Sequence, residues 1–230
     1  MSAAYRPPLH TYLTRPILRG VCRFLFHVLG RVQITGVENV PRGQPYVAVL
    51  NHVSIIDPPA LLSFWPETME TIGAVDVFAR PFQGQLASLY GVIPVHRGEY
   101  DRALISKVLA LLKAGYPLMM APEGGRSHVT AMRRAKPGIG FILQRADVPI
   151  VPAGLVGTTG DFIQRGLHGE RPLVEIRIGK PVHLPPALEG GAARRDARQQ
   201  IADLVMSYVA GLLPEEYRGV YADTAIFPAN

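Results

Sequence analysis

The alternation of short apolar runs with helical patterns after Gly36 constrains the fold of this chain more than any other feature of its sequence. Six apolar runs have the length and composition of buried strands: Tyr46–Leu50, Thr71–Val75, Gly91–Val95, Pro117–Ala121, Ile150–Leu155 and Val174–Ile178. Five other segments have the apolar spacing of helices: Pro58–Phe64, Gln83–Leu89, Arg102–Lys113, Ile139–Ala146 and Arg194–Leu212. This order predicts an α/β fold with a mostly parallel sheet that is covered by helices.

The composition limits the class of protein. The chain has 230 residues, enough for one sizeable domain, and its 48% hydrophobic and 18% charged residues fall short of a multi-span membrane protein. The single cysteine, Cys22, excludes an internal disulfide framework and fits a reducing compartment. Residues 1–45 contain six arginines against one acidic residue, Glu38, a balance that suits nucleic acid, anionic lipid or a phosphorylated ligand. No nucleic-acid-binding motif is present, so we expect a lipid or phosphate partner and no nucleic acid.

The stretch Leu13–Leu29 is predicted to form an amphipathic helix, because its apolar residues recur at helical spacing. Arg15, Arg19, Arg23 and His27 form a polar stripe at steps of four. A stretch this short with three arginines is poorly suited to span a bilayer. Two alternatives remain: the helix lies in the headgroup plane with its arginines toward anionic lipid, or it packs on the protein core with a solvated basic face.

Ionisable residues gather where three of the predicted strands end. The sequence NHVSIID follows the first apolar run, HRGEYD follows the third, and PEGGRS follows the fourth. Ligands of such sheets bind where strands end and loops begin. We therefore expect these three segments to converge on one site.

His52 and Asp57 are the candidates for proton chemistry. They are five residues apart, so they can meet only across a turn, which the start of a helix supplies. Either Ser54 caps this helix in a capping box with Asp57, or Asp57 itself caps it with Pro58 in the first turn. Asp57 could then hold one ring nitrogen of His52 and leave the other free as a general base. The alternative is a loop histidine that is held by an aspartate for stability alone.

Four blocks in order resemble the motifs of the glycerolipid acyltransferases, the family of 1-acylglycerol-3-phosphate acyltransferases. NHVSIID (51–57) resembles their NHxSxxD motif, and GVIPVHRG (91–98) resembles a strand that leads to an arginine, here Arg97. APEGGRS (121–127) resembles FPEGTRS, and PIVPAGL (149–155) resembles a proline-bearing strand near the acyl site. The resemblance runs from about Gly36 to Val182.

The resemblance implies a membrane-docking N-terminal helical segment, residues 1–35, followed by an acyltransferase catalytic domain, residues 36–230. It implies transfer of a fatty acyl group from acyl-CoA or acyl-carrier protein to the sn-2 hydroxyl of lysophosphatidic acid, which gives phosphatidic acid. We expect no cofactor beyond that co-substrate and no metal. The expected partners are a lysophospholipid, an anionic bilayer surface and acyl carrier protein, and the expected location is peripheral, on the cytoplasmic face of the cell membrane.

The resemblance also assigns roles to residues. His52 is the expected general base and Asp57 its partner, while Arg97 and Arg126 carry guanidinium groups suited to phosphate. Glu123 is expected to orient an arginine or a substrate hydroxyl rather than to contact phosphate. The remaining expected substrate-binding residues are Asn51, Ser54, Gly124, Gly125, Ser127 and Pro152.

One departure from the family pattern keeps further activities open. Gly125 stands where lysophosphatidic acid enzymes usually have threonine, and EGGRS is typical of glycerol-3-phosphate acyltransferases, although NHVSIID and the short chain favour the sn-2 enzyme. Glycerol-3-phosphate or another lysolipid is therefore an alternative acceptor. The sequence also allows a thioester hydrolase, a transacylase between phospholipids and a non-enzymatic lipid-binding protein.

Overall fold

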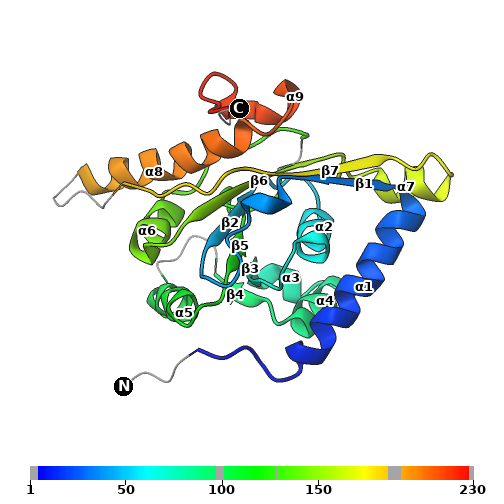
Figure 1. Ribbon diagram of the computed structural model, residues 1–230, viewed down its shortest axis with the longest axis horizontal. Coiled ribbons are helices and arrows are strands. Elements are labelled where there is room, and N and C mark those ends of the chain that lie inside the picture. The colour runs from blue at the N-terminus through cyan, green and yellow to red at the C-terminus, as the bar shows by residue number, and fades with distance from the viewer. Residues whose placement is uncertain (1–4, 97–100, 128, 186–192, 228–230) are drawn as a thin grey trace.

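The computed structural model describes residues 5–96, 101–127, 129–185 and 193–227 (Figure 1). Its centre is a seven-stranded sheet in the order β1-β7-β6-β2-β5-β3-β4. The strands are β1 (Arg31–Thr35), β2 (Val47–Leu50), β3 (Glu70–Ala74), β4 (Ile93–Val95), β5 (Leu118–Met120), β6 (Ile150–Val156) and β7 (Leu173–Ile178). All six predicted strands form, and β1 is an additional one.

The sheet is mostly parallel, as predicted. β2 pairs in parallel with both β5 and β6, and β3 pairs in parallel with β4 and β5. β7 runs antiparallel to β6 and parallel to the edge strand β1. Strand β1 was not predicted because its residues alternate between exposed and half-buried, so Arg31–Thr35 contains no continuous apolar run.

Helices cover both faces of the sheet (Figure 1). One face carries α5 (Arg102–Lys113), α6 (Pro137–Ala146), α8 (Ala193–Ala210) and the short α9 (Glu215–Arg218). The other face carries α1 (Thr11–Leu29), α2 (Asp57–Phe64), α4 (Gln83–Tyr90) and α7 (Phe162–Leu167), with the single turn α3 (Val75–Phe78) after β3. Val47 and Val49 of β2 pack with the first layer, whereas Ala48 and Leu50 pack with the second, as the two-residue period of a strand requires.

The three arginines of α1 bond to the protein, so both alternatives for this stripe are wrong: the arginines do not face lipid, and they do not together form a solvated face. Arg15 is buried, and its Nη1 and Nη2 donate to the two carboxylate oxygens of Glu70 on β3 at 2.6 and 2.8 Å. Arg19 donates to the Thr68 hydroxyl and the Trp65 carbonyl, and Arg23 Nε donates to the Ser63 carbonyl at 2.6 Å. These bonds fix α1 against β3 and the end of α2.

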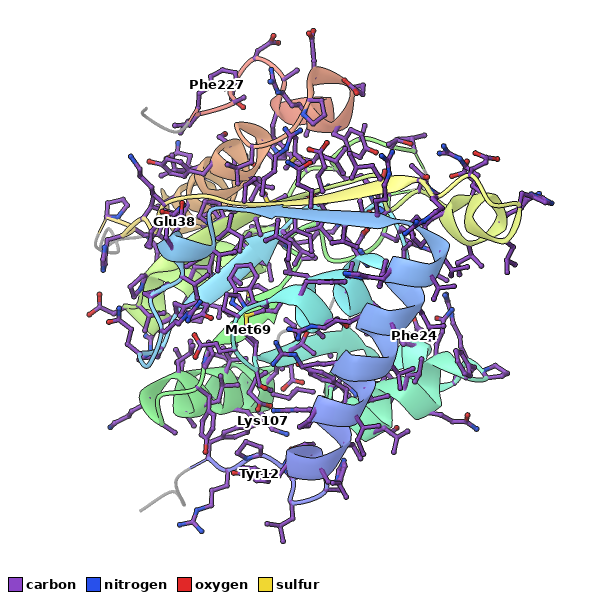
Figure 2. All side chains as sticks on the ribbon, turned by 45° about the vertical axis from the view of Figure 1, so that its right-hand side comes forward. Tyr12, Phe24, Glu38, Met69, Lys107 and Phe227 are labelled. Carbon is purple, nitrogen blue, oxygen red and sulfur yellow. The ribbon has the colours of Figure 1, made fainter. Side chains whose placement is uncertain are left out.

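The opposite face of α1 is exposed and apolar. It presents Leu13, Ile17, Val21, Phe24, Leu25 and Val28. Figure 2 labels two exposed aromatic residues of this helix, Tyr12 near its start and Phe24 near its end, with exposed fractions of 61% and 67%. The sequence pattern shows two stripes but not which of them faces inward; the buried carboxylate of Glu70 decides this, because it requires a cation beside it. Within the described part of the chain, no helix combines the length and the apolarity that crossing a bilayer requires.

The predicted helical segment of residues 1–35 contains both a helix and a strand. α1 ends at Leu29, and Arg31–Thr35 forms β1, which pairs with β7 in the sheet. α1 itself packs against α2, α4 and α7. The division of the chain into a docking segment and a catalytic domain at residue 36 stays a prediction.

Candidate active site

Three neighbouring strands, β6, β2 and β5, run in parallel and deliver their following loops to one edge of the sheet. Residues 51–56 follow β2, residues 121–136 follow β5, and residues 157–161 follow β6. Two of the three segments predicted to converge, NHVSIID and PEGGRS, lie side by side here because their strands are hydrogen-bonded neighbours. Arg97, from the third predicted segment, lies outside the described residues.

Asn51 ties the loop after β2 to β6. Its side-chain Nδ2 donates to the Leu155 carbonyl at 3.0 Å, and its Oδ1 accepts from the Leu155 N–H at 2.8 Å. Because Asn51 is fully buried and its carboxamide is bonded at both ends, its role is to fix the backbone that precedes His52. The expectation that Asn51 binds substrate is corrected accordingly.

His52 and Asp57 meet across the turn that starts α2. His52 Nδ1 lies 2.9 Å from Asp57 Oδ2, with the histidine side chain 17% exposed and the aspartate fully buried. The same carboxylate oxygen accepts from the N–H groups of Val53 and Ser54, each at 2.7 Å. A carboxylate can only accept, so Nδ1 carries the proton and Nε2 is left as the basic nitrogen. The pair can therefore take a proton from a substrate, with Asp57 stabilising the imidazolium that forms.

The turn between them makes both side-chain contacts of the predicted capping box of Ser54 and Asp57, although α2 itself begins only at Asp57. α2 begins at Asp57, with Pro58 in its first turn, and the preceding Ile56 makes no side-chain cap. The Asp57 carboxylate points back to the loop rather than forward to the helix, and the Ser54 hydroxyl accepts from the Ile56 N–H at 3.4 Å. Asp57 thus closes the turn and holds the histidine with the same oxygen.

Glu123 joins the loops after β2 and β5. It is fully buried, its Oε1 accepts from the His52 N–H at 2.8 Å, and its Oε2 accepts from the Arg133 N–H at 2.9 Å. Burial raises the pKa of Glu123 to about 7, although the N–H groups of Arg133 and His52 lower it in part. Glu123 was expected to orient an arginine or a substrate hydroxyl; it positions the backbone of His52 instead.

The glycine-containing segment after Glu123 turns back toward His52. Gly124 has a φ of 68°, and a Cβ there would lie 2.9 Å from the side chain of Lys136, which passes over it. Gly125 follows it in the half-exposed turn, and the Ser127 N–H donates to the His52 carbonyl at 2.8 Å. The loop after β5 is therefore bonded to His52 on both sides, at its N–H through Glu123 and at its carbonyl through Ser127.

A pocket of about 320 Å³ adjoins this pair of loops. Its polar lining comes from Ser54, Arg126, Ser127, Thr130, Thr159 and Gly160. Its apolar lining comes from Val53, Ile55, Ile56, Val129 and Ile163. The Arg126 side chain is half-exposed, and none of the described residues accepts a hydrogen bond from its guanidinium. The pocket thus combines an apolar wall with a guanidinium group that has no partner among the described residues.

Pro152 is not part of the pocket. It lies in the middle of β6, buried, opposite Val49 of β2, and its carbonyl accepts from the Gly179 N–H at 2.9 Å. Pro152 thus pairs within the sheet, and its expected contact with substrate stays a prediction. The described residues contain no cluster of three or more histidine, cysteine or acidic side chains that could hold a metal ion.

The third side of the pocket was not predicted from the sequence. Thr159 and Gly160 belong to the sequence VGTTGD, which follows β6 just as NHVSIID follows β2. The strand-end rule that selected the first three segments would have selected this one as well. Thr130 carried no comparable signal, because nothing in the sequence places it opposite Thr159.

Comparison with known proteins gives consistent results. A family model described as Acyltransferase matches residues 31–156. The chloroplastic 1-acyl-sn-glycerol-3-phosphate acyltransferase of Arabidopsis thaliana is 28% identical over 204 residues, which cover 86% of this chain and 55% of that protein. The human 1-acyl-sn-glycerol-3-phosphate acyltransferase alpha is 30% identical over 170 residues, 72% of this chain and 60% of that protein. The chain therefore spans between half and two thirds of the length of these relatives.

A solved structure shares the fold. The 1-acyl-sn-glycerophosphate acyltransferase PlsC from Thermotoga maritima superposes with a TM-score of 0.59 at 20% sequence identity. The match covers 83% of this chain and 78% of that chain. It therefore includes most of the sheet and helices described above.

Proposed function

The chain belongs to the acyltransferase family, and from this premise we propose that it moves a fatty acyl group from acyl-CoA or acyl-carrier protein to the sn-2 hydroxyl of lysophosphatidic acid, giving phosphatidic acid. Family membership confirms the resemblance predicted from the four sequence blocks, all of which lie within the matched residues 31–156. The acceptor is proposed because the relatives in plants and animals carry that activity in their names.

The observation that carries the proposal is the contact between His52 Nδ1 and buried Asp57, which leaves Nε2 as a base on the residue that precedes Val53 of the pocket lining. In the proposed reaction, Nε2 takes the proton of the acceptor hydroxyl as its oxygen bonds to the thioester carbonyl carbon. The carbon–sulfur bond then breaks, and the departing thiolate takes the proton from the imidazolium. No covalent enzyme intermediate is needed, because a thioester is already activated. A positioned general base contributes about 10²–10⁴-fold, and positioning of the two substrates supplies more.

Arg126 is the proposed partner of the acceptor's phosphate. Its guanidinium lines the pocket without a described protein partner, and a guanidinium fork matches phosphate oxygens. The hydroxyl groups of Ser127, Thr130 and Thr159 line the same pocket and can donate to phosphate or glycerol oxygens. Arg97, which we also propose for phosphate, lies outside the described residues.

The exposed apolar face of α1 is the proposed membrane contact. A bilayer accepts apolar side chains that water does not, and the face extends over most of the helix length. The neighbouring helix α7, which packs against α1 through the buried rings of Phe26 and Phe162, adds the exposed apolar side chains of Ile163 and Leu167, and Ile163 also lines the pocket. The acyl chain of a membrane-bound acceptor would thus reach the site along apolar surface. The single cysteine suits a reducing compartment, and so favours the cytoplasmic face of the membrane.

The proposed function is tested by offering labelled acyl-CoA and labelled acyl-carrier protein to the purified chain with lysophosphatidic acid, lysophosphatidylcholine, glycerol-3-phosphate or no acceptor. We expect labelled phosphatidic acid to form with lysophosphatidic acid at the highest rate. Release of labelled fatty acid without an acceptor at the same rate would indicate a hydrolase and contradict the proposal. Glycerol-3-phosphate is the second candidate acceptor, since the segment EGGRS is typical of enzymes that acylate it, and a preference for it would reassign the acceptor but not the chemistry.

A further inference from the structure

Tyr217 lies outside the residues that the family model matches, yet it bonds to two of the loops whose side chains line the pocket. It belongs to the short helix α9, which follows α8 in the C-terminal part of the chain (Figure 1). Its ring is buried in the core cluster that α6 and α8 share with β2 and β5. No sequence motif pointed to it, because it stands in the unremarkable polar sequence PEEYRG.

Two hydrogen bonds connect Tyr217 to the loops after β5 and β6, both of which contribute side chains to the pocket. Its phenol oxygen accepts from the Gly157 N–H at 3.0 Å, at the start of the loop that carries Thr159. Its backbone carbonyl accepts from the Met132 N–H at 2.9 Å, in the loop that carries Thr130. One residue therefore bonds to both loops from the protein side.

Close backbone contacts fix the chain near both residues to which Tyr217 bonds. Gly157 has a φ of 82°, and a Cβ there would lie 2.0 Å from the Leu173 carbonyl oxygen. Gly219, two residues after Tyr217, has a φ of 52°, and a Cβ there would lie 2.2 Å from the Met132 carbonyl oxygen. The Tyr217 side chain therefore links two backbone segments that close contacts fix, the loop after β6 against Leu173 and the end of α9 against Met132.

The Tyr217 phenol keeps its proton at neutral pH. Burial raises the pKa of Tyr217, the Gly157 N–H lowers it in part, and the negative charges of Glu216, Asp57 and Asp161 raise it. The phenol oxygen therefore accepts from the Gly157 N–H as a neutral group.

We propose that Tyr217 is a positioning residue that sets the separation between the Thr130 and Thr159 walls of the pocket, and through it the affinity for the phosphorylated acceptor. This inference rests on the proposed function, because it assumes that the acceptor occupies the pocket. Tyr217 is not proposed to touch the reacting atoms. Its removal should therefore change the binding of the acceptor and leave the proton transfer by His52 largely unchanged.

The test compares Tyr217→Phe with Tyr221→Phe. The first change keeps the ring and the bond to Met132 and removes only the acceptor of the Gly157 N–H. The second removes a matched phenol, which accepts from the Ala135 N–H at 2.8 Å and donates to Asp203 at 2.8 Å, without reaching the loop after β6. The measurements are the affinity for a short-chain lysophosphatidic acid, the acceptor KM, the donor KM, kcat and the melting temperature.

For Tyr217→Phe we expect acceptor affinity to weaken and acceptor KM to rise by roughly three- to tenfold, the range expected for one lost hydrogen bond. We expect kcat and the donor KM to stay within about twofold, and Tyr221→Phe to lower the melting temperature without changing the acceptor KM. An unchanged acceptor KM in Tyr217→Phe, or an equal rise in both variants, would overturn the inference.

A wild-type chain that binds lysophosphatidic acid without transferring an acyl group refutes the proposed function. The affinities of the two variants for lysophosphatidic acid then still decide the role of Tyr217. If the wild-type chain binds no lysophosphatidic acid, the inference fails with the proposed function.

Discussion

Two polar clusters are buried in this molecule, one beneath α1 and one at the ends of β2 and β5. In the first, Arg15 and Glu70 form a bidentate ion pair, and the Tyr5 hydroxyl donates to the same carboxylate at 2.7 Å. In the second, the buried carboxylates of Asp57 and Glu123 are held mainly by neutral N–H groups and by His52. Within the described part of the chain, Arg126 bonds to the protein through its backbone carbonyl and not through its guanidinium.

This difference identifies the cluster beneath α1 as structural and the cluster at the ends of β2 and β5 as functional. Beneath α1 the charges of Arg15 and Glu70 match each other within the protein, so this pair leaves no charge over for a ligand. At the strand ends, acidic groups are buried without a cation of their own, while a guanidinium beside them faces the pocket. Buried charge that the protein itself does not match is costly, and such sites are where function is concentrated. Four changes test this comparison, from the largest expected effect to the smallest.

Removing the cation beneath α1 should damage the fold without touching the chemistry. Arg15→Met leaves the Glu70 carboxylate buried and unpaired, which should lower the free energy of unfolding by about 3–5 kcal/mol. The double variant Arg15→Met/Glu70→Met should recover much of that loss, because no charge is left unmatched. Urea unfolding of both variants measures this, with Arg31→Met, an exposed arginine of β1, as the control. Equal stability of Arg15→Met and wild type would show that the ion pair does not hold α1.

The buried carboxyl of the site should make stability depend on pH. The folded-state pKa of Glu123 is about 7 against an ordinary value of 4.5, so between these values the folded protein holds a proton that the unfolded chain has lost. Stability should therefore fall as the pH rises from 4.5 to 7, by up to roughly 3 kcal/mol, and this contribution should stay constant above that range.

The measurement is the free energy of unfolding at about pH 5 and about pH 7.5, on either side of most of this titration, for the wild type and for Glu123→Gln. The variant lacks the titrating group, so its stability should change less between the two pH values. Parallel profiles for the two proteins would mean that Glu123 ionises with an ordinary pKa and that its burial has no electrostatic cost.

Removing the Arg126 guanidinium should lower activity and leave stability nearly unchanged, which is the reverse of the effect of Arg15→Met. Arg126→Ala should lower kcat/KM for lysophosphatidic acid by roughly 10–100-fold, the range for one lost bond to a charged group, with little change in stability. Arg134→Ala is the matched control on the same loop, since Arg134 is exposed and pairs with Asp203. Acceptor-independent hydrolysis of acyl-CoA should be unaffected. A similar loss in that side reaction would assign Arg126 to the thioester carrier or to structure.

Changes on the exposed apolar face of α1 should weaken membrane binding alone. Ile17→Ser/Phe24→Ser should weaken binding to vesicles by roughly tenfold, because two apolar side chains no longer enter the bilayer. Phe227→Ser is the control: it also changes an exposed aromatic residue, on another side of the molecule (Figure 2). Binding that depends on apolar insertion should survive high salt, whereas binding through exposed arginines would be screened. Equal flotation of the Ile17→Ser/Phe24→Ser variant and the wild type would assign membrane contact to another surface.

The sequence predicted most strands of the central sheet and the longer helices, because a parallel sheet that is buried on both faces leaves continuous apolar runs, but it did not predict the short helices α3, α7 and α9. It could not predict β1, whose edge position leaves Arg31–Thr35 half-polar. It predicted that α1 is amphipathic but not which face is inward, since that depends on Glu70, a residue that is distant in sequence and buried on β3.

The candidate site was likewise only partly predictable from the sequence. The pairing of His52 with Asp57 follows from their spacing across a turn, and it is present at 2.9 Å. The backbone contacts of Asn51 and Glu123 were not predictable, because both side chains bond to backbone groups supplied by other strands and loops. Tyr217 carried no sequence signal, because its importance comes from two loops that only the tertiary structure brings together.

The central claim is that His52, held by Asp57, removes the proton of the acceptor hydroxyl. The most direct measurement is the single-turnover rate of acyl transfer to lysophosphatidic acid by the wild type, His52→Ala and Asp57→Asn, with acceptor binding and melting temperature recorded for each. We predict at least a roughly 10²-fold lower rate for His52→Ala, with acceptor binding retained, and a clear loss for Asp57→Asn, since an amide does not stabilise imidazolium as a carboxylate does. A folded His52→Ala protein that transfers the acyl group at nearly the wild-type rate would contradict this claim.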